Sequence, residues 1–271
     1  MLKLPTVPSA ELFPIESESF HSGFETYFKG KRQNFFLNLK AFKALWECLQ
    51  LLNDIWIRES SNLETLTDVR HLLPKTVFMS AHGRFLNAVE LGFSCCIGDA
   101  YTLLRDAIEA VAHAHRIFKD PSAEDAWVSK HKGQAELEAH DRVFKWQKKK
   151  NLFPNDVPGL KQLYFYYQQF CEIATHTSVS SVGKNFEDVS SSGSVRWAFH
   201  YFEINPQRMA GFLSALLQVS ARMEEVFYGC FEVRLNLDPE LVRMRAEFQK
   251  VRDQQTRFLY DTYNVGSATA P

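Results

Sequence analysis

Residues 75–121 read KTVFMSAHGRFLNAVELGFSCCIGDAYTLLRDAIEAVAHAHRIFKDP, and this stretch decides the fold. From residue 75 to residue 96 a helix would be apolar on nearly every side, which is typical of a helix in the middle of a bundle. A second helical stretch follows from about Gly98 to Lys119, and Asp120-Pro121 ends it. Two such helices in succession predict an all-α protein with this pair at its centre.

Apolar residues spaced by three and four positions predict further helices on both sides of this centre. Pro74 stands where the first central helix could begin, and three Asx-Pro pairs combine a capping side chain with a proline at the first helical position. The sequence therefore predicts a multi-helix bundle of about six or seven helices. The other helices are expected at 35–60, 122–150, 160–178, from 206 and from 239 onward, and the Asx-Pro pairs are Asp120-Pro121, Asn205-Pro206 and Asp238-Pro239.

One segment alternates between apolar and polar residues instead. After the turn-like SSSGS of 190–194, every second residue from Val195 to Tyr201 is apolar, which predicts a short β-hairpin near 182–203. Residues 1–33 have no clear period and are rich in proline and glycine, so we expect an irregular N-terminal arm, and we expect a disordered tail at 264–271. Without repeats or low-complexity linkers, 1–271 is predicted to be a single helical domain.

The composition agrees with a helical protein that has an aromatic core. The chain contains 23 Phe beside only 12 Gly and 10 Pro, which favours packed helices over a turn-rich β fold. No segment has the roughly 18 uncharged apolar residues of a membrane span, and the N-terminus lacks the apolar core of a secretory signal. The five cysteines are odd in number and lie in apolar helical patterns, so we expect reduced thiols and a cytoplasmic location.

The charge gives no drive toward a polyanion. With 31 basic and 32 acidic residues, the formal net charge is -1, so the sequence favours neither nucleic acid nor an anionic membrane as a partner. The last helix carries a heptad seam flanked by charges, which predicts packing on one partner helix, within the bundle or across a homodimer formed through residues 238–263. The seam residues are Leu241, Met244, Phe248, Val251, Gln255, Phe258 and Thr262.

A candidate polar site lies on the helix that contains YTLLRDAIEAVAHAH, residues 101–115. Arg105, Glu109 and His113 stand one turn apart on the face opposite the apolar residues, with Arg105 at the boundary of the two faces. A solvated helix face with i,i+4 ion pairs would show the same spacing. We nevertheless predict that Arg105 pairs with Glu109, because a partly desolvated guanidinium needs a carboxylate.

A second pair with the same spacing, Glu172 and His176, occurs in FCEIATHTSVSS, residues 170–181. A bundle could bring Glu109, His113, Glu172 and His176 together as metal ligands. However, the di-metal bundles that bind through carboxylates use Glu-x-x-His and further inward-facing acids, which this chain lacks. A metal site is therefore the weaker alternative, and no cofactor is predicted.

The run from FLNAVELGFSCC to KDP, together with YYQQFCEIATHTS, resembles an uncharacterised bacterial family of all-helical proteins, and it is similar in outline to HEPN-type and abortive-infection bundles. The resemblance covers about residues 65–180. It implies a network of Arg105, Glu109 and His176 between two helices. HEPN ribonucleases carry an Arg followed by His after four to six residues, whereas His113 lies seven intervening residues beyond Arg105.

Three functions follow from these observations. The first is an accessory helical protein that acts through protein contacts, with a link to stress or phage defence implied by the resemblance. The second is a HEPN-like, metal-independent endoribonuclease, in which Arg105 holds the phosphate and His113 or His176 is the general acid or base. The third is a bundle that binds a metal or a small ligand.

Overall fold

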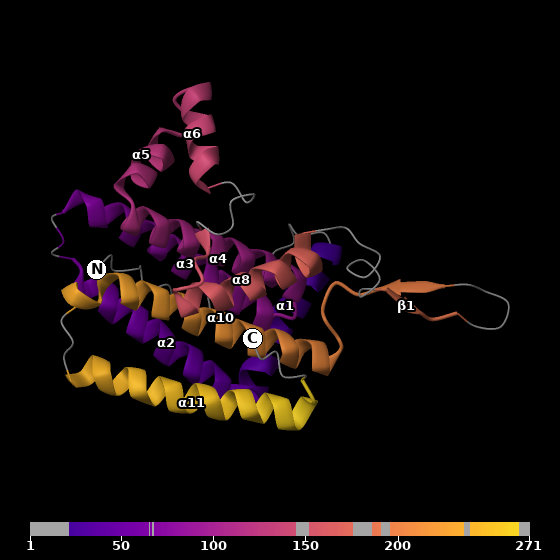
Figure 1. Ribbon diagram of the computed structural model, residues 1–271. Helices are drawn as coiled ribbons and strands as arrows, with labels where there is room; N and C mark the ends of the chain where they lie inside the picture. The colour runs from indigo at the N-terminus through magenta and orange to yellow at the C-terminus, as the bar shows by residue number, and fades with distance from the viewer. Residues whose placement is uncertain are drawn as a thin grey trace.

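The chain forms a helical bundle from which a two-stranded hairpin projects (Figure 1). The computed structural model describes residues 22–64, 66, 68–144, 152–175, 186–190, 196–235 and 239–265. These ranges contain nine α-helices, which confirms the all-α class but exceeds the six or seven predicted, because two predicted helices are each broken in two. In the same ranges we find no helix whose length and apolar character would suit a bilayer-spanning segment.

The predicted central pair is α3 (Val69–Phe93) and α4 (Ile97–Lys119), which pack against each other. The predicted apolar face of α4 is confirmed, since Leu104, Ile108 and Val111 are fully buried. α3 begins before Pro74, which is a correction to the predicted start. The carboxylate of Asp68 caps the helix by accepting a hydrogen bond from the Arg70 N–H, and Pro74 lies inside.

The corner between α3 and α4 is made by two adjacent cysteines. The Cys95 N–H donates to the Gly92 carbonyl and the Cys96 N–H to the Leu91 carbonyl, which is the Schellman ending of a helix. Cys95 has a φ of 62°, in the left-handed region that glycine usually occupies at this position. None of the five cysteines forms a disulfide bond, as predicted.

The N-terminal part is more helical than predicted. Residues 22–33 belong to α1 (Ser22–Ala41), so the irregular arm is wrong for this part, and residues 1–21 lie outside the described ranges. Gly30 lies within this helix, and the Phe202 ring packs against it. A side chain at this position would crowd the ring, because a Cβ would lie 3.1 Å from Phe202 Cε2. The helix predicted over 35–60 is interrupted at Phe42, after which α2 (Lys43–Asn62) begins.

The polar helix predicted at 122–150 is also two helices. As predicted, Asp120 caps α5 (Pro121–Ser129) and proline occupies its first turn. α5 ends at Ser129, and a turn leads through Gly133 into α6 (Gln134–Phe144). Both helices project from the bundle (Figure 1). Residues 145–150 lie outside the described ranges.

The later elements agree better with the prediction. α8 (Pro158–Phe170) continues into a π-helical turn, η2 (Cys171–Thr175), and the predicted hairpin is present as β1 (Phe186–Asp188) paired antiparallel with β2 (Trp197–Phe199). Asn205 caps α10 (Pro206–Phe231) as predicted, and this largely buried helix packs on α4 and α8. A short 3-10 turn, η3 (Glu232–Arg234), follows it. The predicted tail from 266 onward lies outside the described ranges.

The last helix, α11 (Pro239–Tyr263), packs along α2 and on α10, so the predicted seam is used within the bundle (Figure 1). Leu241 and Phe248 are buried as predicted. Toward the C-terminal end of α11 the predicted seam is wrong. Phe258, a predicted seam residue, is 44% exposed, whereas its neighbour Leu259 is fully buried. A straight helix turns every 3.6 residues rather than every 3.5, so the buried face drifts away from the heptad positions.

A buried ionic cluster joins α2, α10 and α11. Arg245 Nη1 of α11 donates to Glu59 Oε1 of α2 at 2.7 Å and also to Glu224 Oε1 of α10, and both carboxylates are buried. The Arg245 guanidinium lies 3.8 Å from the centroid of the Tyr228 ring. Burial, followed by repulsion from Glu224, raises the pKa of Glu59 to about 9. At neutral pH, therefore, Glu59 is protonated. Burial raises the pKa of Glu224 as well, and the charge of Arg245 opposes this rise.

Removal of Arg245 should destabilise the fold, because it leaves the buried Glu59 and Glu224 without the guanidinium that donates to both. We expect Arg245→Met to lower the free energy of unfolding, measured by urea denaturation, by about 3–5 kcal/mol. The control is Arg243→Met, since Arg243 is exposed on the same helix and pairs with Glu240 at the surface. This variant should unfold nearly like the wild type, and equal losses in both variants would contradict the role of the cluster.

Candidate functional site

Three of the four predicted site residues line one cavity. Arg105, Glu109 and His113 of α4 face a cavity of about 550 Å³ that is also lined by residues of α3 and α5. Cavities that hold small molecules have volumes of about 300–1,000 Å³. The polar face of α4 is therefore part of a cleft between three helices, which helical spacing alone could not distinguish from a solvated surface.

Arg105 pairs with its neighbour Asp106 rather than with Glu109. The predicted Arg105–Glu109 ion pair is therefore wrong, because the adjacent carboxylate lies within reach of the Arg105 guanidinium. Burial lowers the pKa of Arg105, but the hydrogen bond and the charge of Asp106 outweigh it, so that the pKa is raised. The Arg105 Nε atom is buried and has no hydrogen-bond acceptor. Arg105 is thus charged and keeps one donor without a partner.

Glu109 connects the cleft to α8. The Tyr167 hydroxyl donates to Glu109 Oε2 at 3.5 Å, which is a long hydrogen bond. Burial, followed by the charge of Glu109, raises the pKa of Tyr167. The tyrosine therefore stays protonated at neutral pH and can only donate to this carboxylate.

His113 is an uncharged member of the cleft. Its ring packs edge-on against Phe144 of α6, with the two centroids 4.8 Å apart. Burial, followed by the positive fields of His140 and Lys130, lowers the pKa of His113 to about 4. At neutral pH the ring is a neutral hydrogen-bonding group, and its low basicity makes it a poor general base.

The cleft also contains two residues that sequence reasoning missed. Arg84 comes from α3 and Trp127 from α5. Nη1 of Arg84 donates to the carbonyl and to the hydroxyl of Ser80, and within the described ranges Arg84 forms no ion pair with a carboxylate. Arg84 interrupts the nearly apolar stretch of residues 75–96, which was the one sequence signal for it, whereas nothing in the pattern pointed to Trp127.

Of the two remaining predicted site residues, Glu172 and His176, only Glu172 lies within the described ranges. Glu172 is exposed in the η2 turn, and His176 lies outside the described ranges. Accordingly, the predicted network of Arg105, Glu109 and His176 stays a prediction. The described part of the chain contains no group of three or more His, Cys, Asp or Glu residues that could hold a metal ion.

Comparisons with known proteins add no relative to this description. No protein-family model, no curated protein and no solved structure matches the chain.

The protonation state of His113 can be tested directly. We expect its Cε1 proton resonance to titrate near pH 4, well below the ordinary value of about 6.5, because the buried imidazolium would lose its hydration. The measurement is an NMR pH titration, with the resonance assigned from His113→Gln. A midpoint between pH 6 and 7 would mean that the ring is hydrated and able to act in acid–base catalysis.

Proposed function

We propose that this protein is a small-molecule-binding helical bundle and that the α3–α4–α5 cleft takes a small organic anion. The observation that carries the proposal is the presence of two guanidinium groups in one cavity of about 550 Å³, of which Arg105 has a buried Nε–H without an acceptor. A buried donor without an acceptor is costly, so a ligand that supplies the acceptor is stabilised there.

The two arginines favour an anionic group on the ligand. Arg84 has no carboxylate partner in the described ranges, and Arg105 keeps its buried Nε–H free although Asp106 balances its charge. Guanidinium groups bind carboxylates and phosphates by paired, charge-assisted hydrogen bonds. The hydroxyl of Ser80 adds a further donor on the same side as Arg84.

The apolar residues of the cleft favour a ligand with an organic body. Leu73, Val77 and Ala110 line the cavity, and the Trp127 indole adds an aromatic wall. Apolar and aromatic walls combined with placed polar groups suit a small organic molecule. Binding rather than catalysis is the function supported here, because the neutral His113 ring is too weakly basic to take a proton efficiently at neutral pH.

The proposal predicts that anions bind and that their neutral counterparts do not. We expect AMP and phenyl phosphate to bind in isothermal titration calorimetry, and adenosine and phenol to bind at least tenfold more weakly. Arg84→Gln and Arg105→Gln should each weaken binding about tenfold or more, because each removes charge-assisted hydrogen bonds. Arg243→Gln is the matched control, since Arg243 lies on α11, away from the cleft.

Two outcomes would overturn the proposal. Equal affinity for AMP and adenosine, or no binding of any of the four probes, would exclude an anion site. The HEPN-like endoribonuclease, which rests on the resemblance of residues 65–180, would instead be supported by RNA cleavage. In that case the wild type should cleave a single-stranded RNA and His113→Ala should not.

A second candidate function, contact with another protein, is supported by an exposed aromatic surface. This surface joins α1 and the hairpin through ring contacts. In the hairpin, the Phe199 ring contacts those of Phe186 and Tyr201. Tyr201 contacts Tyr27 of α1, which contacts Phe28, and Phe28 stacks on Phe24. A lone two-stranded hairpin is marginally stable in water, so we expect a partner to cover it. This surface consists of Phe24, Phe28, Phe186, Trp197, Phe199 and Tyr201.

We propose a second copy of the chain as that partner. The six side chains are 41–71% exposed, and at about 200 Å² each they offer roughly 600 Å². A standard interface buries about 800 Å² per partner, so this surface could supply most of a dimer interface. The predicted homodimer would then form through α1 and the hairpin rather than through α11, whose seam is used within the bundle.

The homodimer can be tested by light scattering after size-exclusion chromatography. We expect the wild type to have twice the chain mass and the double variant Trp197→Ser, Phe199→Ser to be monomeric, because it removes two exposed aromatic side chains. Val233→Ser is the control, since Val233 is 99% exposed outside this surface. A monomeric wild type at about 100 μM would contradict this partner.

A further inference from the structure

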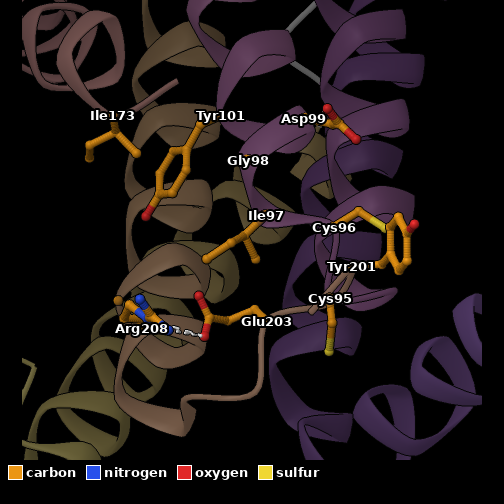
Figure 2. Close-up of a pocket in the computed structure, with 11 residues that line it drawn as sticks. Cys95, Cys96, Ile97, Gly98, Asp99, Tyr101, Ile173, Tyr201, Glu203 and Arg208 are labelled. Carbon is orange, nitrogen blue, oxygen red and sulfur yellow. Dashed lines mark hydrogen bonds and ion pairs between the residues drawn. The ribbon is translucent and has the colours of Figure 1, made fainter. Parts of the chain in front are cut away.

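A second cavity lies at the start of α4, on a different part of the bundle from the arginine cleft. Its volume is about 470 Å³, and it is lined by the first residues of α4, the beginning of α10 and the chain between the hairpin and α10 (Figure 2). The chain is held there by its backbone, because the Glu203 N–H donates to the Cys95 carbonyl at 2.8 Å. The walls of this cavity are thus fixed by secondary structure on both sides.

The N-terminus of α4 opens into this cavity without a side-chain cap. Cys96 occupies the capping position and makes no capping hydrogen bond. The first backbone N–H groups of a helix have no partner in the helix, and the helix dipole adds a partial positive charge there. Gly98 leaves this end accessible, since a Cβ at this position would meet nothing within 4 Å.

Tyr101 points its hydroxyl into the same cavity (Figure 2). The ring packs against Phe170 and Phe212, with centroid distances of 4.9 and 5.1 Å, and burial raises the pKa of the hydroxyl. The Tyr101 hydroxyl makes no hydrogen bond to any residue in the described ranges. Because the Tyr101 hydroxyl lines the cavity and has no protein partner in the described ranges, a group bound in the cavity can accept its hydrogen bond.

Arg208 of α10 faces this group across the cavity (Figure 2). Its Nε and Nη2 atoms donate to Glu203 Oε1 at 3.1 and 2.9 Å, which fixes the guanidinium in place and neutralises the buried carboxylate. The other acid of the cavity, Asp99, is exposed and lies on the far side of Gly98 from Tyr101 (Figure 2).

We propose that this cavity is a second ligand site, which binds the oxyanion of a small molecule, a phosphate or a carboxylate, between the N-terminus of α4, the Tyr101 hydroxyl and Arg208. The backbone N–H groups at the helix start and the hydroxyl supply donors, which is the usual arrangement for an anion at a helix N-terminus. The Asp99 charge opposes the bound anion from one side and limits the affinity.

The test uses the whole protein, inorganic phosphate and acetate as probes, and the backbone amide resonance of Gly98 in ¹⁵N-correlated NMR spectra. We expect a saturable shift of Gly98 that persists in the Arg84→Gln, Arg105→Gln double variant. If the α3–α4–α5 cleft proves not to bind anions, this result would therefore be unaffected. Tyr101→Phe, which removes only the hydroxyl, should weaken binding about fivefold to tenfold.

Two further variants separate this site from a nonspecific effect. Cα–Cβ bonds tilt toward the helix N-terminus, so Gly98→Ala places a methyl group in the anion's position. It should abolish the ligand-induced shift of the amide at position 98 without lowering the melting temperature. Gly83→Ala is its control, because a Cβ at Gly83 also meets nothing within 4 Å. Asp99→Asn should strengthen binding severalfold, whereas weaker binding would show that the site prefers a cation. No saturable shift in the wild type, or unchanged binding in both Gly98→Ala and Tyr101→Phe, would overturn the proposal.

Discussion

The contact of Arg245 with Glu59 and Glu224 is the constraint on which the arrangement of the outer helices depends. α11 buries only Leu241, Phe248 and Leu259, so its apolar surface alone fixes its position weakly. Two buried acids, Glu59 and Glu224, both accept hydrogen bonds from Arg245, so the guanidinium is needed at one definite place. A shift of α11 by one turn would separate the guanidinium from both acids. The ionic cluster therefore determines the register of α11, and the apolar contacts with α2 and α10 follow from it.

The sequence predicted the fold where a single helix carries its own signal. The apolar face of α4, the Asn205 cap of α10 and the alternating residues of β2 all depend on neighbours within a few positions, and each was confirmed. Glycine and proline misled the prediction at Gly30 and Pro74, because tertiary packing outweighs local propensity. At Gly30 the missing side chain makes room for a ring from the other end of the chain.

The sequence predicted only those residues of the candidate site that lie on one helix. Helical spacing puts Arg105, Glu109 and His113 on one face, whether or not another helix covers it. Arg84 and Trp127 join them only because α3 and α5 cross that face, and no pattern within one helix reports such a crossing. The Arg245 cluster could not be predicted either, since Arg245 lies 186 residues from Glu59 and 21 residues from Glu224 in the sequence. Sites that are built from helices far apart in the sequence could be identified only in the three-dimensional structure.

The left-handed backbone of Cys95 limits how this protein can change over evolution. The side chain must leave room for the carbonyl groups of the α3–α4 corner, so residues branched at Cβ are excluded there by steric clash rather than by loss of any chemical role. Among homologous sequences, glycine and asparagine are the expected substitutes at this position, and they would retain the corner. The neighbouring Cys96 has no such restriction. Two adjacent and chemically identical residues are thus expected to drift at different rates, and the reason lies in one backbone angle.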